Sequence, residues 1–275
     1  MKITQAILPV AGLGTRFLPW TKVVPKELLP IGSQPIIAHL VDECISIGID
    51  DICFVISRGK EMIPQYFYAA PALEHELKRR GKHTMLDELK RYDTVRLHVV
   101  YQEDQLGDGH AILQAVPWVQ SDTIAVLFGD DIIVGDENGL QQLVRAHAGL
   151  PAEERTHASV LTLENVPAEL THKYGIADID PSRSSGRLHR IKGLVEKPAA
   201  GEAPSTLGIV GKYLIPRRIF DLLPIVAPSH GGEIRLVDGL IAHLKNGPVY
   251  GYEFAGKRYD TGSPEGYKEA VRELG

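Results

Sequence analysis

Two glycines and two cations near the amino terminus have the types and spacing needed to bind phosphate. Gly12 and Gly14 flank a single residue, directly after an apolar run over residues 3–10 that predicts a first strand. A turn without side chains lets backbone N–H groups face an anion. Arg16 can hold two phosphate oxygens in its guanidinium fork, and Lys26 can add a mobile point charge. This combination predicts a site for a triphosphate.

The loop differs from two commoner glycine-rich phosphate loops. A dinucleotide fingerprint needs a third glycine where Phe17 stands, and a P-loop needs a Gly-Lys-Ser or Gly-Lys-Thr closure that the loop lacks. The two glycines alone are equally compatible with an ordinary strand-to-helix turn. The cations and prolines that follow them favour the anion site.

A candidate metal ligand follows a second apolar strand, predicted over residues 123–128. Asp130 and Asp131 come after its carboxyl end. In an open parallel sheet the ligand crevice lies at that edge, so a carboxylate there can hold a metal over phosphates. Because side chains alternate along an extended chain, both carboxylates cannot easily point into the crevice, and we choose Asp130. Without the first loop, a plain surface turn would be the simpler interpretation.

The pattern of apolar residues predicts the elements that position these groups. Residues 35–47 carry an apolar stripe at helical spacing, and residues 52–57 read as a buried strand, which gives a βαβ unit and a parallel sheet. Further strands are expected at 95–101, 174–178, 188–196, 208–213 and 249–254, with a turn at 181–186, and residues 157–163 open the second half of the chain. Solvent-facing helices are expected within 62–92, a further helix at 233–244, and a last helix that begins at Pro264 with Ser263 as its N-cap.

Composition limits the class of protein. The chain has 275 residues, 44% of them hydrophobic and 24% charged, as expected of a soluble globular protein. A net charge of -5 argues against a general nucleic-acid-binding surface. We expect no membrane span and no signal peptide. Cys44 and Cys53 lie in apolar surroundings and are too few for a zinc framework, which favours free thiols in a reducing cytoplasm.

The first 30 residues also contain a longer signature. Ala11-Gly12-Leu13-Gly14-Thr15-Arg16-Phe17-Leu18-Pro19 is followed by Thr21-Lys22-Val23-Val24 and by Pro25-Lys26-Glu27-Leu28-Leu29-Pro30. This signature resembles that of the bacterial UTP–glucose-1-phosphate uridylyltransferases, among the sugar-1-phosphate nucleotidyltransferases. The resemblance implies transfer of UMP from UTP to α-D-glucose 1-phosphate, with UDP-glucose and pyrophosphate as products and Mg²⁺ as cofactor. It implies a homo-oligomer, dimer or tetramer, with no nucleic-acid or membrane partner.

The resemblance implies a fold and residue roles as well. We expect an α/β fold with a Rossmann-like, mixed and mostly parallel sheet, as one domain over 1–275. Residues 1–150 would form the nucleotide-binding half and 151–275 the sugar-phosphate-binding half. The implied catalytic residues are Arg16, Lys26 and Lys197; the nucleotide-binding residues are Ala11, Gly12, Gly14, Thr15, Glu27, Gln102 and Gly107; the sugar-binding residues are Gly175, Glu196 and Lys197; and the metal ligands are Asp130 and Asp260.

Three positions depart from the family pattern and keep alternatives open. Asp108 stands where relatives carry an apolar residue, Gly129 resembles the thymidylyltransferase branch, and Trp20 is unusual beside the first loop. A dTTP-using sugar nucleotidyltransferase is therefore the nearest alternative. A second is a catalytically silent paralogue, although the charged residues of the signature are all present. His110 lacks a second histidine at metal-ligand spacing and is expected to be structural.

Overall fold

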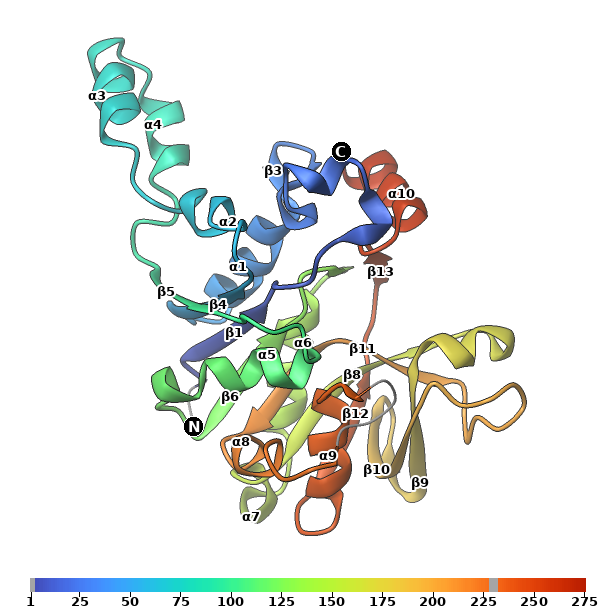
Figure 1. Cartoon of the computed structure of the whole chain (residues 1–275). Coiled ribbons are helices and arrows are strands. Elements are labelled where there is room, and N and C mark those ends of the chain that lie inside the picture. Colours follow the sequence, from blue (N-terminus) through green and yellow to red (C-terminus); the bar gives the residue numbers. More distant parts are fainter. Residues whose placement is uncertain (1–2, 228–231) are drawn as a thin grey trace.

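The computed structural model describes residues 3–227 and 232–275, and a sheet of nine strands runs through this part of the chain (Figure 1). Its strands, in spatial order, are β5 (Arg96–Tyr101), β4 (Asp51–Ile56), β1 (Gln5–Pro9), β6 (Thr123–Leu127), β11 (Leu207–Pro216), β8 (Ser159–Asn165), β12 (Val249–Glu253), β10 (Leu188–Glu196) and β9 (Gly175–Ser185).

The direction of the strands changes across the sheet. The pairs β5–β4, β4–β1 and β1–β6 are parallel, whereas β11 is antiparallel to both β6 and β8. Beyond them β12 is parallel to β8, and β10 is antiparallel to β12 and β9. The expected mixed α/β fold is confirmed, but the sheet is not mostly parallel: four of its nine strand pairs are parallel, and three of these four lie in the amino-terminal half. The β6–β11 pair joins the strands of the two halves into one sheet. The division of the chain into a nucleotide-binding and a sugar-phosphate-binding half near residue 150 stays a prediction.

Alternating side chains of β1 pack against two layers of helices, one on each face of the sheet. Ile7 and Leu8 are both fully buried but lie in different apolar clusters, one on each face of the sheet. Helices α1 (Ile36–Ser46) and α6 (Gly139–Ala148) cover the face of Leu8; α5 (Asp108–Gln114), α8 (Ile219–Leu222) and α9 (Leu236–Leu244) cover the other. The continuous apolar character of β1 follows from this double burial.

Short elements beyond the main sheet carry the carboxylates to the site. Strand β7 (Asp131–Val134) pairs antiparallel with β13 (Lys257–Asp260), so that Asp131 lies opposite Asp260. Helix α10 (Pro264–Leu274) follows, and its N-cap Ser263 accepts a hydrogen bond from the Gly266 N–H at 3.2 Å, as predicted. The short elements between β1 and α1 are η1 (Thr15–Phe17), η2 (Trp20–Lys22), η3 (Lys26–Leu28), β2 (Pro30–Ile31) and β3 (Gln34–Pro35).

A buried ion pair fixes the start of β7. The Lys212 side chain is fully buried and its Nζ lies 2.9 Å from Glu43 Oε1, while it also donates to the Asp131 carbonyl at 2.9 Å. A Cβ at Gly139 would lie 2.7 Å from Lys212 Cδ, so only glycine leaves room for the lysine stem. A buried ion pair adds little net stability but specifies geometry when its hydrogen bonds are complete. It therefore fixes the backbone next to Asp130.

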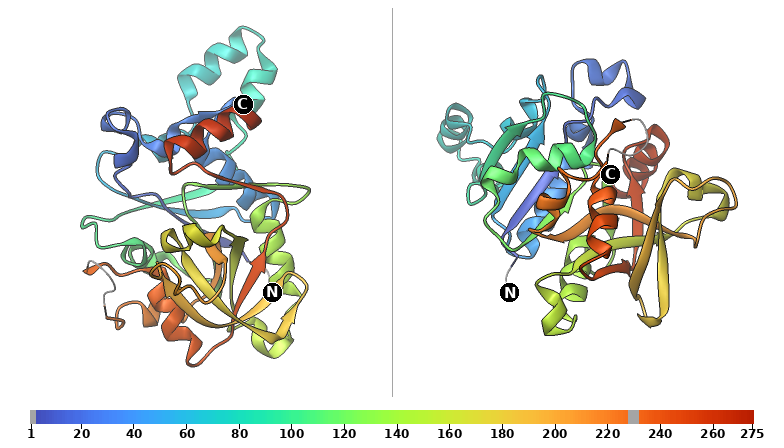
Figure 2. Two further views of the ribbon diagram at one scale, coloured as in Figure 1. Left: turned by 90° about the vertical axis from the view of Figure 1, so that its right-hand side faces the viewer. Right: turned by 60° about the horizontal axis from the view of Figure 1, so that its bottom comes forward.

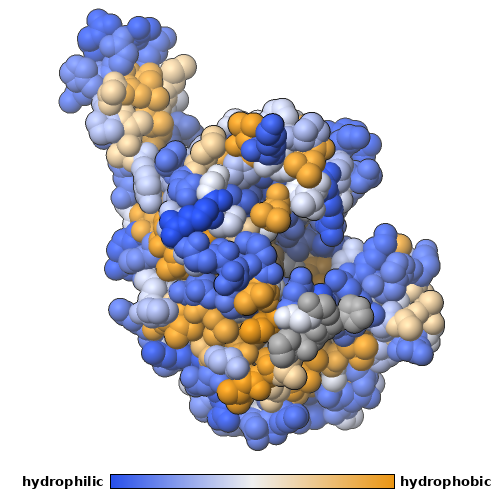
Figure 3. Space-filling view, viewed as in Figure 1, coloured by the Kyte–Doolittle hydropathy of each residue, from blue (hydrophilic) through white to orange (hydrophobic). Residues whose placement is uncertain are grey.

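The charged, leucine-spaced region forms an arm. After α2 (Met62–Gln65), helices α3 (Pro71–Arg79) and α4 (His83–Leu89) pack against each other and stand clear of the body (Figures 1 and 2). Neither helix has a buried residue, and the outer end of the arm is hydrophilic (Figure 3). The prediction of solvent-facing helices is confirmed. No helix in the described ranges is long and apolar enough to cross a bilayer.

Two predicted boundaries were wrong for local reasons. The turn expected at 181–186 is shorter, because β9 continues to Ser185 and only Gly186, with a φ of 57°, and Arg187 connect it to β10. Helix α9 begins at Leu236 and not at residue 233, because Arg235 is extended, with φ of -112° and ψ of 151°.

The other short helices are α7 (Ala152–Arg155), η4 (Val116–Trp118) and η5 (Ala168–Lys173).

Candidate active site

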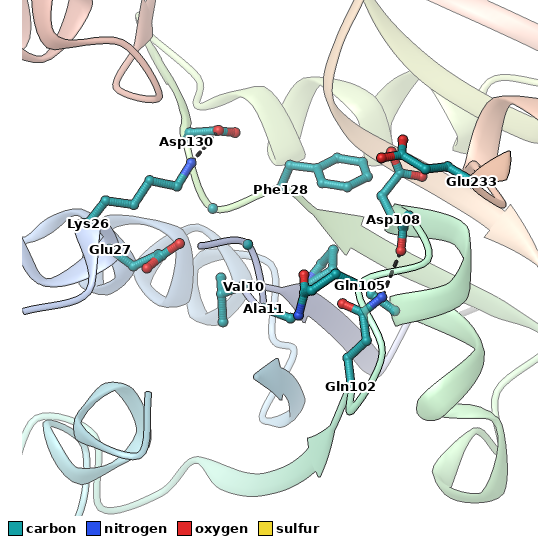
Figure 4. Close-up of a pocket in the computed structure, with 15 residues that line it drawn as sticks. Val10, Ala11, Lys26, Glu27, Gln102, Gln105, Asp108, Phe128, Asp130 and Glu233 are labelled. Carbon is teal, nitrogen blue, oxygen red and sulfur yellow. Dashed lines mark hydrogen bonds and ion pairs between the residues drawn. The ribbon is translucent and has the colours of Figure 1, made fainter. Parts of the chain in front are cut away.

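A cleft of about 330 Å³ opens where β1 and β6 end (Figure 4). It falls in the volume range typical of small-molecule sites and at the strand edge where α/β proteins bind ligands. Among its lining residues are seven predicted ones: Ala11, Gly12, Lys26, Glu27, Gln102, Gly107 and Asp130. Lys26 faces Asp130 at one end, Asp108 and Glu233 lie at the other, and Phe128 lies between the two ends.

The glycine loop forms one rim of this cleft. Gly14 has a φ of 66°, in the left-handed region that favours glycine, and its carbonyl accepts a hydrogen bond from Thr21 Oγ1 at 2.8 Å. Gly12 is exposed, and nothing lies within 4 Å of the position that its Cβ would occupy. Thr15 and Arg16 are exposed on η1, outside the lining of the cleft. The loop is thus open to an incoming anion.

Lys26 and Asp130 form the charged end of the cleft. Lys26 Nζ lies 2.7 Å from Asp130 Oδ2. Burial opposes the charge of Lys26, but Asp130 and Glu27 outweigh it, and the lysine pKa is raised. Burial also opposes ionisation of Asp130, yet Lys26, with help from Arg258 and Arg16, lowers the pKa of this carboxyl below its usual value. Both groups therefore carry charge at neutral pH.

The two predicted metal ligands converge on one glycine. A Cβ at Gly262 would lie 2.6 Å from Asp130 Oδ2 and 3.1 Å from Asp260 Oδ1, so both carboxylates surround a position that must lack a side chain. Asp260 Oδ1 also accepts from the Gly262 N–H at 3.0 Å, and Arg16 donates to the Gly262 carbonyl at 3.3 Å. Residues 16, 130 and 260, distant in sequence, thus share one corner of the molecule.

This donor set suits Mg²⁺. Two carboxylates supply hard oxygen ligands, and Mg²⁺ typically takes one or two of them and completes its octahedron with water and substrate phosphates. Within the described ranges no group of three or more His, Cys, Asp or Glu side chains is placed to hold a metal. Asp130 and Asp260 are therefore the residues that could hold such an ion, with water and phosphate oxygens as its other ligands.

Asp131 serves the scaffold. Its carboxylate pairs with Arg258 Nε, and Arg258 Nη1 lies 2.9 Å from Glu164 Oε2. Burial raises the pKa of Asp131 to about 6; Arg258 opposes this effect, whereas Asp130 and Asp260 add to it. Asp130 alone of the two consecutive aspartates lines the cleft. The side chains therefore separate as the alternation argument requires.

The predicted base-side residues surround the second glycine turn. Gln102 is buried and donates from Nε2 to the Gly107 carbonyl at 2.9 Å, with His110 Nδ1 at 3.1 Å from the same atom. His110 Nε2 lies 3.2 Å from Gln114 Nε2, so this histidine is structural, as predicted. Gly107 has a φ of 104°, and a Cβ there would lie 2.4 Å from the Ile234 carbonyl. Its role in admitting a base stays a prediction.

A smaller cavity continues the cleft toward the predicted sugar side. Gly175 and Glu196 line it, and it shares Asp108 and Phe128 with the larger cleft. A Cβ at Gly175 would lie 3.0 Å from Glu196 Oε2, so the glycine keeps this oxygen accessible. Lys197 lies outside both cavities, with its side chain 53% exposed and its Nζ 3.7 Å from Glu196 Oε1. Two of the three predicted sugar residues thus come together.

Local contacts explain the residue types at Glu27 and Gly129. Glu27 lines the cleft, but its two carboxylate oxygens accept from Lys60 Nζ at 3.0 and 3.1 Å, so it supports the loop, and a contact with nucleotide stays a prediction. A Cβ at Gly129 would lie 2.8 Å from Val10 Cγ1 and 3.3 Å from Glu27 Cγ. Packing between strand ends accounts for glycine at 129 without reference to the nucleobase.

Sequence reasoning missed the partners that hold the predicted residues. Lys60 pairs with Glu27, Arg258 with Asp131, and Arg235 with Glu196. Arg258 could have been inferred, because it lies two residues before Asp260 and strand periodicity puts both on one face. Nothing in the local sequence around Lys60 or Arg235 names its partner.

A mixed α/β sheet with a glycine loop, two cations and two converging carboxylates at its strand ends is the arrangement expected of a nucleotide-binding enzyme. A family model described as nucleotidyl transferase matches residues 5–275. The chain therefore belongs to the nucleotidyl transferase family, and the resemblance seen in the first loop is confirmed over nearly the whole chain.

Several relatives share this length and fold. A UTP–glucose-1-phosphate uridylyltransferase from Bacillus subtilis (strain 168) is 40% identical over 267 residues, which cover 97% of this chain and 89% of the relative. A solved structure described as UTP-bound UGPase from Acinetobacter baumannii is 36% identical, with a TM-score of 0.89 over 99% of this chain and 93% of its own. A UDP-glucose pyrophosphorylase complexed with UDP-glucose is 33% identical, with a TM-score of 0.85 and coverage of 98% and 97%.

Proposed function

We propose that this protein transfers UMP from UTP to α-D-glucose 1-phosphate, releasing pyrophosphate and UDP-glucose, with Mg²⁺ as cofactor. The observation that carries the proposal is the convergence of Asp130 and Asp260 on Gly262, beside Arg16 and Lys26. The uridylyltransferases among its relatives support UTP and glucose 1-phosphate as the substrates.

The reaction needs charge neutralisation more than proton transfer. A phosphate monoester has a second pKa of about 6, so the attacking oxygen of glucose 1-phosphate is already anionic at neutral pH. The barrier lies in bringing two anions together and in aligning the attacking oxygen, the α-phosphorus and the leaving oxygen. The cleft supplies cations and backbone N–H donors. Because the attacking oxygen belongs to the substrate, the reaction requires no nucleophilic side chain.

Each residue has a part in this scheme. Backbone N–H groups at Gly12 and Gly14 bind the triphosphate, and Arg16 and Lys26 neutralise the β- and γ-phosphates and the departing pyrophosphate. Asp130 and Asp260 would hold Mg²⁺, which when bound supplies charge neutralisation between the two reacting phosphates.

On the sugar side, Lys197 steers the sugar phosphate while Glu196 accepts hydrogen bonds from sugar hydroxyls beside Gly175. Gln102 and Gly107 bind the uracil. We include in the proposal a homo-oligomer in a cytoplasmic compartment, and the free, buried Cys44 and Cys53 suit reducing conditions.

A substrate comparison tests the proposed specificity. Pyrophosphate release is measured with UTP or dTTP, each combined with glucose 1-phosphate or galactose 1-phosphate, in the presence of Mg²⁺. We expect kcat/KM for UTP with glucose 1-phosphate to exceed every other combination by about tenfold or more, the discrimination that a few lost or added pocket contacts provide. A preference for dTTP would instead assign the chain to the thymidylyl-transferring alternative.

A further inference from the structure

The extended segment before α9 connects the predicted base loop to the predicted sugar site. The Ile234 carbonyl accepts from the Gly109 N–H at 2.9 Å, and the Ile234 N–H donates to the Leu106 carbonyl at 2.8 Å. Asp108 Oδ1 accepts from the Leu236 N–H at 2.7 Å. Residues on both sides of Arg235 are thus hydrogen-bonded to the 106–109 turn.

The side chain of Arg235 extends from this anchored backbone to the sugar side. Its Nη1 lies 2.6 Å from Glu196 Oε1, and its Nε and Nη2 lie 3.2 and 3.0 Å from Glu233 Oε2. The arginine side chain is only 14% exposed and that of Glu196 22%, so water screens this pair weakly. A guanidinium held on two sides keeps one orientation.

Among the residues that the structure describes, one oxygen of Glu196 accepts from Arg235 and the other has no hydrogen-bond partner. Oε1 is held by Arg235, whereas Oε2 lies against the backbone of Gly175, in the small cavity. A carboxylate held in this way presents a fixed acceptor to a hydroxyl. Without the arginine, Oε1 would keep the exposed Lys197, with its Nζ at 3.7 Å, as a weaker partner. A less well aligned acceptor binds a polar group less tightly.

Asp108 completes the connection. It lies between the two cavities, and burial raises its pKa to about 6, while the Leu236 N–H opposes that rise. Its hydrogen bond to Leu236 requires only an oxygen acceptor, which asparagine also supplies. The departure of Asp108 from the family pattern thus has a structural use, because it fixes the residue that follows Arg235.

From these contacts we infer that Arg235 is a positioning residue for the sugar ring of glucose 1-phosphate. It orients Glu196 and is itself held by the 106–109 turn and Asp108. The inference rests on the proposed function, since it takes Glu196 as the group that binds sugar hydroxyls. Arg235 touches no reacting atom in this scheme and acts through the carboxylate.

Steady-state kinetics of Arg235→Gln test the inference. We expect the KM for glucose 1-phosphate to rise about tenfold or more, the loss typical of a hydrogen bond to a charged group, with the KM for UTP within about twofold of wild type. Arg235→Lys, which keeps the charge but not the fork, should give a smaller rise and replaces the first variant if that one does not fold. The control Arg96→Gln removes an exposed arginine of β5 and should change neither KM.

A double-substitution cycle separates positioning from a general structural role. If Arg235 acts through Glu196, the Arg235→Gln and Glu196→Gln effects on the KM for glucose 1-phosphate should be strongly non-additive. Asp108→Ala should raise the same KM, and Asp108→Asn should restore it. Additive effects, or a fall in kcat with both KM values unchanged, would overturn the inference. A wild-type chain that makes no UDP-glucose would instead refute the proposed function.

Discussion

Replacing Asp130 by asparagine is expected to lower kcat about a thousandfold and to weaken the dependence of the rate on Mg²⁺. The variant keeps the shape of the side chain but removes its negative charge. Asp130 carries that charge at neutral pH, because Lys26 lowers the pKa of the carboxyl more than burial raises it. Loss of one preorganised electrostatic contact at a transition state typically costs about 10²–10³ in kcat. Turnover measured against Mg²⁺ concentration, by pyrophosphate release, checks this expectation.

The nearby Asp136→Asn variant is a matched control, because Asp136 is exposed on the loop after β7. It should behave as wild type. Thermal unfolding of both variants shows whether the fold is intact. If Asp130→Asn retained near-normal kcat at limiting Mg²⁺, Asp130 would no longer be a candidate metal ligand.

Replacing Arg16 by alanine is the second change with a large expected effect. Arg16 is exposed on η1 and donates one long hydrogen bond, of 3.3 Å, to the Gly262 carbonyl, so its removal should cost little stability. The guanidinium is proposed to neutralise charge on the departing pyrophosphate, and arginines in that role contribute about 10³ or more to turnover. We expect kcat to fall by about this factor at saturating UTP.

Arg16→Lys should recover only part of this loss, because an ammonium is a point charge and cannot hold two oxygens in a planar fork. The comparison is made at saturating concentrations of both substrates, with the melting temperature recorded for each variant. Equal turnover in wild type and Arg16→Ala would exclude Arg16 from the chemistry.

The sequence predicted those features that depend on local pattern. Buried strands, the choice between Asp130 and Asp131, and the cap at Ser263 follow from periodicity and capping chemistry, and the structure agrees. At Gly14 the φ of 66° shows why glycine is favoured there, whereas the binding of an anion by this loop stays a prediction. These signals act within a few residues and can be read without knowledge of the tertiary fold.

The features that escaped prediction depend on contacts between distant segments. In the sequence, Arg235 lies within the first turn of a predicted amphipathic helix. In the structure, hydrogen bonds between Ile234 and the 106–109 turn keep the backbone extended, and the Arg235 side chain donates to Glu196. Lys60 reaches Glu27, 33 residues earlier in the chain. Tertiary hydrogen bonds outweigh local helix propensity in such places. Only the fold shows which charges become neighbours.

The most direct test of the account is the product balance of the wild-type reaction. UTP, glucose 1-phosphate and Mg²⁺ are incubated with the protein, and phosphorus-containing products are followed by ³¹P nuclear magnetic resonance. The account predicts UDP-glucose and pyrophosphate in equal amounts, with no inorganic phosphate. Hydrolysis of UTP to inorganic phosphate, or tight binding of UDP-glucose with no turnover, would contradict it.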